Sequence, residues 1–349
     1  YHIVDQPYTE AFRRNRGVRG QWYNDFICHG LGYPNEWFSP EKIYFVKKET
    51  GTASEKDELL HNISVVDGNI KVKGFPLEEN RLYILCPYGI GDTLFVASLV
   101  KSYKIYYNEQ REVSLIVKEN QRMIADWFSD IDGKIVSSSL ADALNTYCIA
   151  NQLWRSANFI YGHFRKDIYG GPCRNLENKD PFSLYKRNIF NLPMECSYEV
   201  PDIKNEIKES PYAIGRNDII LMPYAASVAL IPKVFWETLA EFLRKNGYGL
   251  YTNVKDDTEQ PIKGTALLTG DLDCLIALCK RSYAVISLRS GICDVLAFTS
   301  TRLFVIDTDE YYYRNWNVAQ LVAREGIVDL FYREPEDAGI IIREIAERI

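Results

Sequence analysis

The chain has 349 residues, of which 46% are hydrophobic and 25% are charged, and its formal net charge is −6. This composition is typical of a soluble protein with more than one domain, and the negative charge argues against a general electrostatic attraction to nucleic acid. No stretch reaches the roughly 18 consecutive apolar residues of a membrane span, and residues 1–20 show no secretory leader. We therefore expect a cytoplasmic protein with at most peripheral contact to the inner face of the membrane.

The eight cysteines form no C-x-x-C pair, and several of them lie inside apolar runs. In a chain of this length the pattern favours reduced thiols over a disulfide framework. The four histidines are scattered along the sequence. A structural zinc site is therefore not expected.

The first 80 residues contain one readable element, a hairpin over residues 63–72 in which two β-branched runs flank Asp67-Gly68. An arginine-rich stretch over residues 12–22 is interpreted as a solvated arm, with a charged acceptor or lipid headgroups as alternative partners. From Arg81 onward, strands and helices alternate. The predicted strands are 82–86, 113–117 and 135–137, and the predicted helices are 92–104 and 121–128.

The second half of the chain repeats this alternation after an ambiguous, aromatic-rich region over residues 151–201. One helix has proline at its start and Gly247 just past its end, which is the expected asymmetry of helix termini. The predicted strands are 218–222, 248–252, 283–287 and 302–306. The predicted helices are 232–245, 272–280, 290–298 and 339–349.

Alternating strands and helices indicate parallel sheets that are covered by helices on both faces. We predict an α/β fold with two doubly wound, Rossmann-like domains that face each other across a cleft. The predicted segments are an N-terminal extension over 1–80, an acceptor-side domain over 81–205, a nucleotide-sugar-binding domain over 206–335, and a C-terminal helix over 336–349.

The first motif, CPYGIGDTLF over residues 86–95, stands where a strand turns into a helix. It does not match a dinucleotide fingerprint, because Leu94 takes the place of the third small residue. A Walker loop would need G-K-S/T, which is absent. Asp92 would also repel a phosphate at the positive end of a helix. Gly89 and Gly91 therefore make room for a group other than phosphate.

Asp92 itself has two interpretations. It is either the helix N-cap, whose carboxylate accepts a bond from a backbone N–H one turn on, or a general base that takes a proton from a hydroxyl. The residue type and position fit both roles.

The second motif, SLRSGICD over residues 287–294, is another turn from strand to helix, and its charge suits phosphate. Arg289 offers two parallel donors, while Ser290 and Gly291 offer a hydroxyl and bare backbone N–H groups. Asp294 would bind a ribose hydroxyl, pair with Arg289, or complement the helix dipole. The alternative interpretation is a capped turn with a surface arginine.

A third stretch, over residues 223–248, has small residues at the end of a strand, followed by a helix. Lys233 is a candidate second phosphate contact at the start of that helix. The alternative is an ordinary solvated lysine at a helix end.

In this order, the three stretches resemble the ADP-heptose:lipopolysaccharide heptosyltransferase family and its relatives from surface-glycan clusters, glycosyltransferases with two Rossmann domains. GIGDTL matches the family's G-x-G-D-x-L, ASVALIPKVFW loosely matches its middle motif, and residues 289–294 align with its late D-S-G-x-x-H turn. The resemblance covers about residues 81–306. The sequence departs from the family at Arg289, which replaces an aspartate, at Asp294, which replaces a histidine, and at Ala229, where a lysine is usual.

The resemblance implies a glycosyltransferase of hexosyl or heptosyl type that moves a sugar from a nucleotide-sugar to a glycan, glycolipid or glycoprotein hydroxyl. It implies inversion at the sugar without a metal or other cofactor, and with Asp92 as base. The acceptor or sugar would lie against Gly89, Gly91 and Thr93. The nucleotide diphosphate would be held by Ser227, Lys233, Arg289, Ser290, Gly291 and Asp294.

Three alternatives remain open on the sequence. Asp307-Thr308-Asp309 resembles the D-x-D pair with which another transferase class binds manganese. The same scaffold also suits a nucleotide-sugar epimerase or hydrolase. Finally, it suits a nucleotide-binding subunit without activity, since a fold alone does not establish catalysis.

Overall fold

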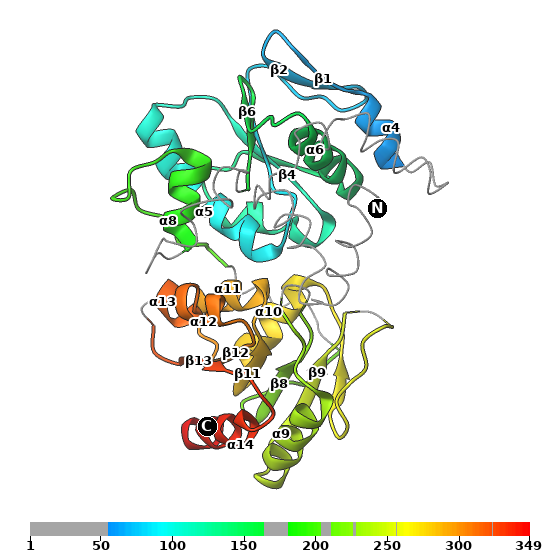
Figure 1. The fold of residues 1–349 in the computed structure, drawn as a ribbon, viewed down its shortest axis with the longest axis vertical. Coiled ribbons are helices and arrows are strands. Elements are labelled where there is room, and N and C mark those ends of the chain that lie inside the picture. Colours follow the sequence, from blue (N-terminus) through cyan, green and yellow to red (C-terminus); the bar gives the residue numbers. More distant parts are fainter. Residues whose placement is uncertain (1–54, 164–180, 204–210, 226–227, 256, 323) are drawn as a thin grey trace. The chain divides into compact units, whose positions relative to one another are not determined.

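The computed structural model describes residues 55–163, 181–203, 211–225, 228–255, 257–322 and 324–349 (Figure 1). The described chain divides into two compact units, the first reaching to Asp202 and the second starting at Ile203. The arginine-rich stretch over residues 12–22 and the predicted domain boundary at 205–206 lie outside the described residues.

The first unit opens with helix α4 (Glu55–His61) and an antiparallel hairpin of β1 (Ile63–Val66) and β2 (Asn69–Val72), as predicted. Asp67 and Gly68 form its turn with φ angles of 51° and 75°, the left-handed values that such a two-residue turn requires. The buried side chain of Asn158 ties this hairpin to the main sheet, because its amide bonds both the N–H and the carbonyl of Ile70.

The main sheet of the first unit has the strand order β5-β4-β3-β7-β6, and all neighbours are parallel except β6 and β7. Tyr83 of the central strand pairs with Ser114 on one side and Phe159 on the other. The strands are β3 (Leu82–Leu85), β4 (Val113–Val117), β5 (Gly133–Val136), β6 (Arg155–Ser156) and β7 (Phe159–Tyr161). The first three confirm the predicted strands, and the last two lie in the ambiguous region.

Helix α5 (Ile90–Tyr107) confirms the first predicted helix and is longer at both ends. The predicted helix over 121–128 is wrong, because two short 3₁₀ turns, η2 (Glu119–Gln121) and η3 (Ile124–Trp127), take its place. The Gln121 side chain explains part of the difference. It accepts from the Lys118 N–H at 2.9 Å and donates to the Tyr88 carbonyl, which ties this segment to the neighbouring turn.

Three further helical segments complete the first unit: α6 (Ser138–Ala150), α8 (Pro181–Tyr185) and the π-helix η5 (Lys186–Phe190). None was predicted. Leu140 and Leu144 of α6 join the core that includes Leu85, Phe159 and the hairpin residue Ile70. Helix α6 therefore buries one face of the sheet together with the hairpin.

The sheet of the second unit is parallel throughout, with strand order β10-β9-β8-β11-β12-β13. Val285 in the middle pairs with Ile220 and Leu303. The strands are β8 (Asp218–Met222), β9 (Gly249–Asn253), β10 (Ala266–Leu268), β11 (Ala284–Leu288), β12 (Leu303–Asp307) and β13 (Ile327–Phe331). Four of them confirm predicted strands, whereas β10 and β13 were not predicted.

The helices of the second unit include all four that were predicted. They are α9 (Lys233–Lys245), α10 (Leu272–Arg281), α11 (Gly291–Ala297), α12 (Glu310–Asn315), α13 (Val318–Leu321) and α14 (Asp337–Arg348). Gly247 follows α9 with a φ of 89°, the left-handed conformation that makes glycine the usual residue at a helix end.

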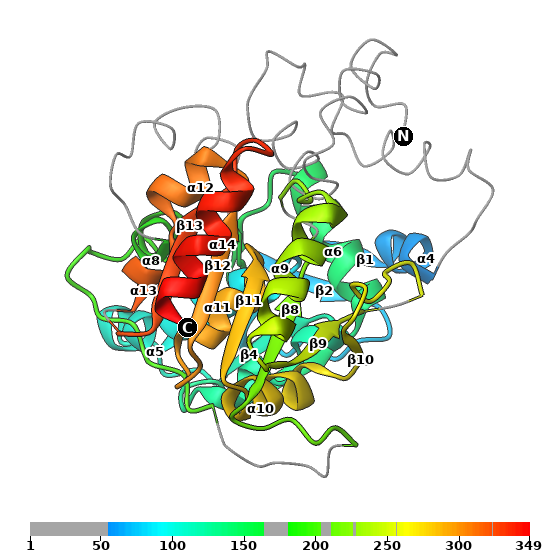
Figure 2. The ribbon, with the colours of Figure 1, turned by 90° about the horizontal axis from the view of Figure 1, so that it is seen from below.

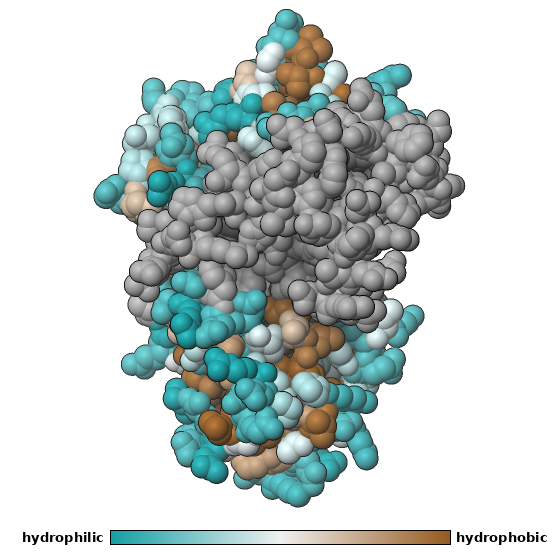
Figure 3. Space-filling view, in the orientation of Figure 1, coloured by the Kyte–Doolittle hydropathy of each residue, from teal (hydrophilic) through white to brown (hydrophobic). Residues whose placement is uncertain are grey.

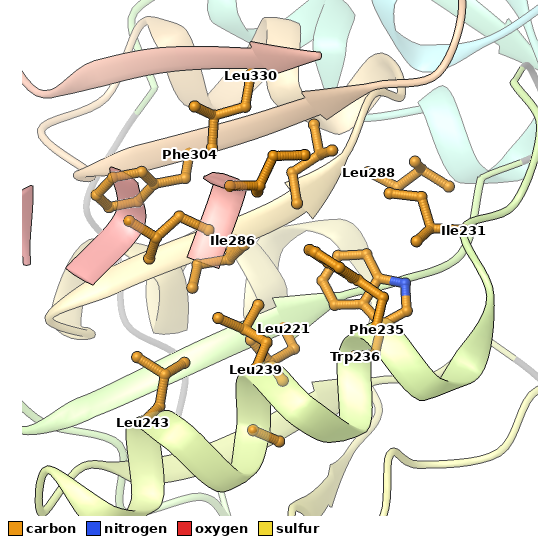
Figure 4. Close-up of a cluster of buried hydrophobic side chains, with 14 of the residues drawn as sticks. Leu221, Ile231, Phe235, Trp236, Leu239, Leu243, Ile286, Leu288, Phe304 and Leu330 are labelled. Carbon is orange, nitrogen blue, oxygen red and sulfur yellow. The ribbon is translucent and has the colours of Figure 1, made fainter. Parts of the chain in front are cut away.

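Helix α9 buries its apolar face against the sheet (Figure 4). Phe235, Trp236 and Leu239 point toward alternate residues of the central strands, including Leu221 and Ile286. Helix α14 contributes to the same core, and Figure 2 shows both helices over one face of this sheet. Burial of aromatic side chains of this size typically contributes a few kcal/mol each, so this face stabilises the unit strongly.

The surface seen in Figure 3 is mostly hydrophilic where residues are described, with apolar side chains near the hairpin, where Val65 and Val66 are 41% and 47% exposed. None of the described helices combines the length and the apolar character that crossing a membrane requires. No disulfide links any two of the six cysteines in the described part of the chain.

Candidate functional site

Both sheets reverse their strand order beside the first strand of the alternating pattern. In the first unit, β4 and β5 lie on one side of β3 while β7 lies on the other; in the second, β9 and β10 lie on one side of β8 while β11, β12 and β13 lie on the other. Ligands of open α/β sheets bind outside the carboxyl ends of the strands at such a switch point. The turns after β3, β7, β8 and β11 are therefore the places to look for a site.

The turn after β3 holds Asp92 in the first turn of α5. Gly89 is the N-cap residue, and its N–H donates to Oδ2 of Asp92 at 3.1 Å. The expected N-cap role of Asp92 is thus wrong in detail, because Asp92 is the third helical residue and accepts its bond from the residue before the helix. The Thr93 hydroxyl donates back to the Gly89 carbonyl at 3.0 Å. These two hydrogen bonds within the turn fix its conformation.

The three small residues of this turn differ in their access to solvent. Gly89 is exposed, whereas Gly91 and Thr93 are buried. A Cβ on Gly89 would come within 3.2 Å of Oδ2 of Asp92, so a side chain here would crowd the carboxylate. The structure thus brings Gly89, Gly91, Asp92 and Thr93 together, and of the three small residues only Gly89 is exposed to a ligand.

The Asp92 carboxylate is about one-third accessible, with a side-chain exposure of 30%. The hydroxyl of Tyr185, at the end of α8, donates to its Oδ1. Nε2 of His163, just after β7, lies 3.7 Å from the same oxygen. Tyr185 and His163 are both buried. The partly exposed carboxylate is thus bonded by Gly89 and Tyr185 and flanked by His163.

His163 reaches this position because Gly162 allows a close approach of two strand ends. The Gly162 N–H donates to the Leu85 carbonyl at 2.8 Å, and a Cβ on Gly162 would lie 2.3 Å from that oxygen. The imidazole packs edge-on against Tyr88 with ring centroids 4.0 Å apart. Burial lowers the pKa of His163 to about 4, although the charge of Asp92 opposes the shift. The imidazole is therefore neutral at pH 7.

Polar aromatic side chains surround the turn. The hydroxyls of Tyr88 and Tyr161 lie 3.2 Å apart, and Tyr161 donates to Oδ1 of Asn145 at 2.8 Å. Cys86 starts the motif but is buried, and that burial together with the Asp92 charge raises the pKa of its thiol. A buried thiol with a raised pKa is inert, so Cys86 is no candidate nucleophile.

The turn after β11 holds Arg289 in a different environment. Its guanidinium binds Asp294 with two bonds, Nη1 to Oδ2 at 3.2 Å and Nη2 to Oδ1 at 2.7 Å, and Nη1 also donates to the Ser290 carbonyl at 2.8 Å. The side chains of Arg289 and Asp294 are only 6% and 5% exposed. Of the roles considered for Asp294, the structure shows the pairing with Arg289. Ser290 is the N-cap of α11 and Gly291 is its first residue.

Asp307, at the end of β12, is a buried carboxylate beside this pair. Neither of its oxygens has a hydrogen-bond partner within the described part of the chain. Burial raises the pKa of Asp307 to about 7, although the Arg289 charge opposes the shift and Asp329 adds to it. Asp329 in turn accepts from the N–H groups of Val318 and Ala319 at the start of α13.

This burial bears on the D-x-D alternative. Asp307 is fully buried whereas Asp309 is exposed, so the two carboxylates do not share one environment. A pair of carboxylates that binds a metal would need an oxygen of each carboxylate to face the same ion. Among the described residues there is also no group of three or more His, Cys, Asp or Glu side chains that could hold a metal ion.

The remaining predicted contacts lie near the end of β8. Lys233 is 61% exposed in its side chain and forms an ion pair with Glu237 at 3.6 Å. The carbonyl of Ala229 accepts from the Thr308 hydroxyl at 2.8 Å, which links the turn after β8 to the turn after β12. Ser227 lies outside the described residues.

Solved structures of two bacterial transferases are similar to this chain. ADP-heptose lps heptosyltransferase II of E. coli matches with a TM-score of 0.51 and 12% identity, over 76% of this chain and 98% of that one. E. coli heptosyltransferase WaaC with ADP matches with a TM-score of 0.51 and 10% identity, over 77% and 100% of the two chains. The chain has the fold of these heptosyltransferases. The predicted α/β fold class is thereby confirmed.

No family model matches the chain, and no curated protein matches it in sequence. Sequence reasoning also missed two residues of the site, His163 and Tyr185. For His163 there was a signal, since an apolar run, Phe159–Tyr161, leads into Gly162-His163 as a strand leads into a turn. For Tyr185 the sequence carries no comparable signal, because its helix has only five residues.

Proposed function

We propose that the protein is a glycosyltransferase that moves a sugar from a nucleotide-sugar to a hydroxyl of a glycan, glycolipid or glycoprotein. The observation that carries the proposal is the Asp92 carboxylate, held at the switch point of the first sheet by Gly89 and Tyr185 with one side open to solvent. The fold supports it, because two heptosyltransferases share that fold over most of this chain. We place the protein in surface-polysaccharide synthesis in the cytoplasm.

In the proposed reaction, Asp92 acts as the general base. The acceptor hydroxyl gives its proton to the carboxylate while its oxygen attacks the anomeric carbon of the sugar. The bond from that carbon to the phosphate oxygen breaks on the opposite face, so that the configuration inverts and a nucleoside diphosphate leaves. The exposed Gly89 would contact the acceptor or the sugar, while the buried Gly91 and Thr93 would shape the turn behind it.

We propose that the diphosphate binds to the second unit, at the turns after β8 and β11. Ser290 and Gly291 would supply a hydroxyl and backbone N–H, with Ser227 and the exposed Lys233 as further donors. Arg289 is buried and bonded to Asp294 through both Nη atoms, so its part in the diphosphate site would be to hold this turn in shape. The Lys233 charge and the donors of the turn would stabilise the departing diphosphate, and we propose that the reaction needs neither metal nor cofactor.

The first experiment is a thermal-shift panel of nucleotide-sugars, because a ligand that binds only the folded state raises the melting temperature. ADP-sugars come first, since one of the similar structures was solved with ADP, followed by UDP-, GDP- and CMP-sugars. The donor that binds is then incubated with and without glycan acceptors, and released nucleotide is measured. Transfer to an acceptor supports the proposal.

Asp92→Asn tests the base. Loss of a general base should lower the transfer rate by about a hundred- to ten-thousandfold, while the thermal shift from the donor stays at its wild-type value. Asp130→Asn is the matched control, since Asp130 is an acid of the same unit that faces Lys101 at 4.0 Å rather than the site. A wild-type rate in Asp92→Asn would overturn the assignment, and donor turnover without acceptor would indicate an epimerase or hydrolase instead.

A further inference from the structure

We propose that Tyr185 is a positioning residue that holds the Asp92 carboxylate in its reactive orientation. This inference rests on the proposed function of Asp92 as base. Tyr185 lies 93 positions after Asp92 in the chain, and its hydroxyl donates directly to Oδ1. The residue is fully buried, so that substrate cannot contact its ring.

The aromatic packing behind Tyr185 aims its hydroxyl. Its ring packs against Phe95, one turn after Asp92 on α5, with centroids 5.4 Å apart. Phe95 also meets Phe182 edge-on at 5.0 Å, and Phe182 stacks on Tyr198 at 4.0 Å. Two rings of α8, Phe182 and Tyr185, therefore dock this helix on Phe95 of α5. A side chain fixed in this way has little freedom to seek another partner.

The two donors to Asp92 act on different oxygens. Gly89 N–H binds Oδ2 and belongs to the same turn, so it alone leaves Oδ1 without a fixed donor. Tyr185 binds Oδ1 from another helix. With both oxygens bonded, the carboxylate plane cannot rotate without breaking a bond, and the open side of the carboxylate faces one direction. Holding a reacting group in its productive geometry lowers the activation barrier, because the group does not have to be oriented during the reaction.

The imidazole of His163 lies beside Oδ1 of Asp92 but is too far away to donate a hydrogen bond to it. Its Nε2 lies 3.7 Å from that oxygen, beyond normal hydrogen-bond distance. The imidazole thus fills space beside the carboxylate. Tyr185 is the partner that sets the orientation.

The test is Tyr185→Phe, which removes the hydroxyl and keeps the ring. We expect kcat to fall about ten- to a hundredfold, as expected when a reacting group is misplaced by about 1 Å, with donor affinity and melting temperature close to wild type. Tyr83→Phe is the matched control, because Tyr83 is a buried tyrosine of the same unit whose hydroxyl binds the Glu78 N–H and the Pro76 carbonyl. That variant should keep wild-type kcat.

A double variant separates positioning from a general structural effect. In an Asp92→Asn background there is no base to orient, so adding Tyr185→Phe should leave the residual rate unchanged. A further loss in that background would show that Tyr185 acts on something other than Asp92 and would overturn the inference. Wild-type kcat in Tyr185→Phe, with Asp92→Asn inactive, would overturn it as well.

The variant Asp92→Glu tests whether the orientation of the carboxylate matters, and it does so without changing Tyr185. It keeps a carboxylate but moves it one methylene away from the bonds to Gly89 and Tyr185. We expect its kcat to fall at least tenfold, whereas a rate equal to wild type would show that orientation is unimportant. Failure of the proposed function is visible separately, because the wild-type protein would then transfer no sugar to any acceptor, whereas failure of the base assignment alone would leave Asp92→Asn at the wild-type rate.

Discussion

The turn after β3 and the turn after β11 both follow a strand at the switch point of its sheet, yet their charged side chains have opposite surroundings. Asp92 keeps one side toward solvent and is held by uncharged donors. Arg289 and Asp294 are buried and are bonded to each other. A charged group that is bonded only by neutral donors can still react with a substrate. A charged group that is buried in an ion pair with its neighbour mainly stabilises the fold. The first turn is therefore the better candidate for a reacting group.

The largest expected effect comes from breaking the pair in the second unit. Arg289→Met leaves Asp294 as a buried carboxylate without its cation, which typically costs about 3–5 kcal/mol of unfolding free energy. Urea unfolding at pH 7 measures it. Arg343→Met, at an exposed position of α14, is the control and should change stability by less than about 0.5 kcal/mol. An equal loss of unfolding free energy in the two variants would mean that the buried ion pair contributes no more to stability than an exposed arginine does.

The next effect tests the unsatisfied carboxylate beside that pair. Because the pKa of Asp307 is raised to about 7, the folded state keeps a proton that the unfolded state loses above about pH 4. Stability should therefore fall as pH rises from about 4 to about 7, by at most about 4 kcal/mol. Asp307→Asn should remove this slope and unfold at higher urea than wild type at pH 7.5, whereas the exposed Asp309→Asn should retain the wild-type slope.

The first unit should respond to pH in the opposite direction. The pKa of His163 is lowered to about 4, so the unfolded state binds a proton below about pH 6.5 that the folded state does not. Stability should fall as pH drops from about 6.5 to about 4, by about 3 kcal/mol at most. His163→Gln should flatten that slope, as measured by urea unfolding across this range. An unchanged slope would contradict the burial argument, and the exposed His61→Gln serves as control.

The two units also differ in how far the sequence predicted them. In the second unit, four strands and four helices were predicted, because apolar strands such as β8 alternate with helices, of which α9 is clearly amphipathic. In the first unit, α6 was not predicted, and the segment after β4 is two 3₁₀ turns in place of a helix. Local periodicity did not reveal that the Gln121 side chain anchors this segment to the neighbouring turn.

The features of the candidate site likewise divide into those that the sequence predicted and those that it did not. The GIGD turn was readable because glycines at a strand end and an acid at a helix start are local signals, and Asp92 is indeed in the first turn of α5. The burial of Arg289 was not readable, because a sequence does not state which way a side chain points. The hypothesis of a capped turn with a surface arginine is wrong on that second point, since Arg289 is only 5% exposed.

By itself, the sequence determined the α/β class, the position of most strands, and the carboxylate at the turn after β3. These features follow from short-range rules, since strand and helix periods and turn residues act within about ten positions. Only the tertiary structure decided which partners surround that carboxylate. Strand order brings Gly162-His163 beside β3, and aromatic packing brings Tyr185 onto α5. Contacts between residues so distant in sequence depend on the packing of the whole unit, which no local pattern encodes.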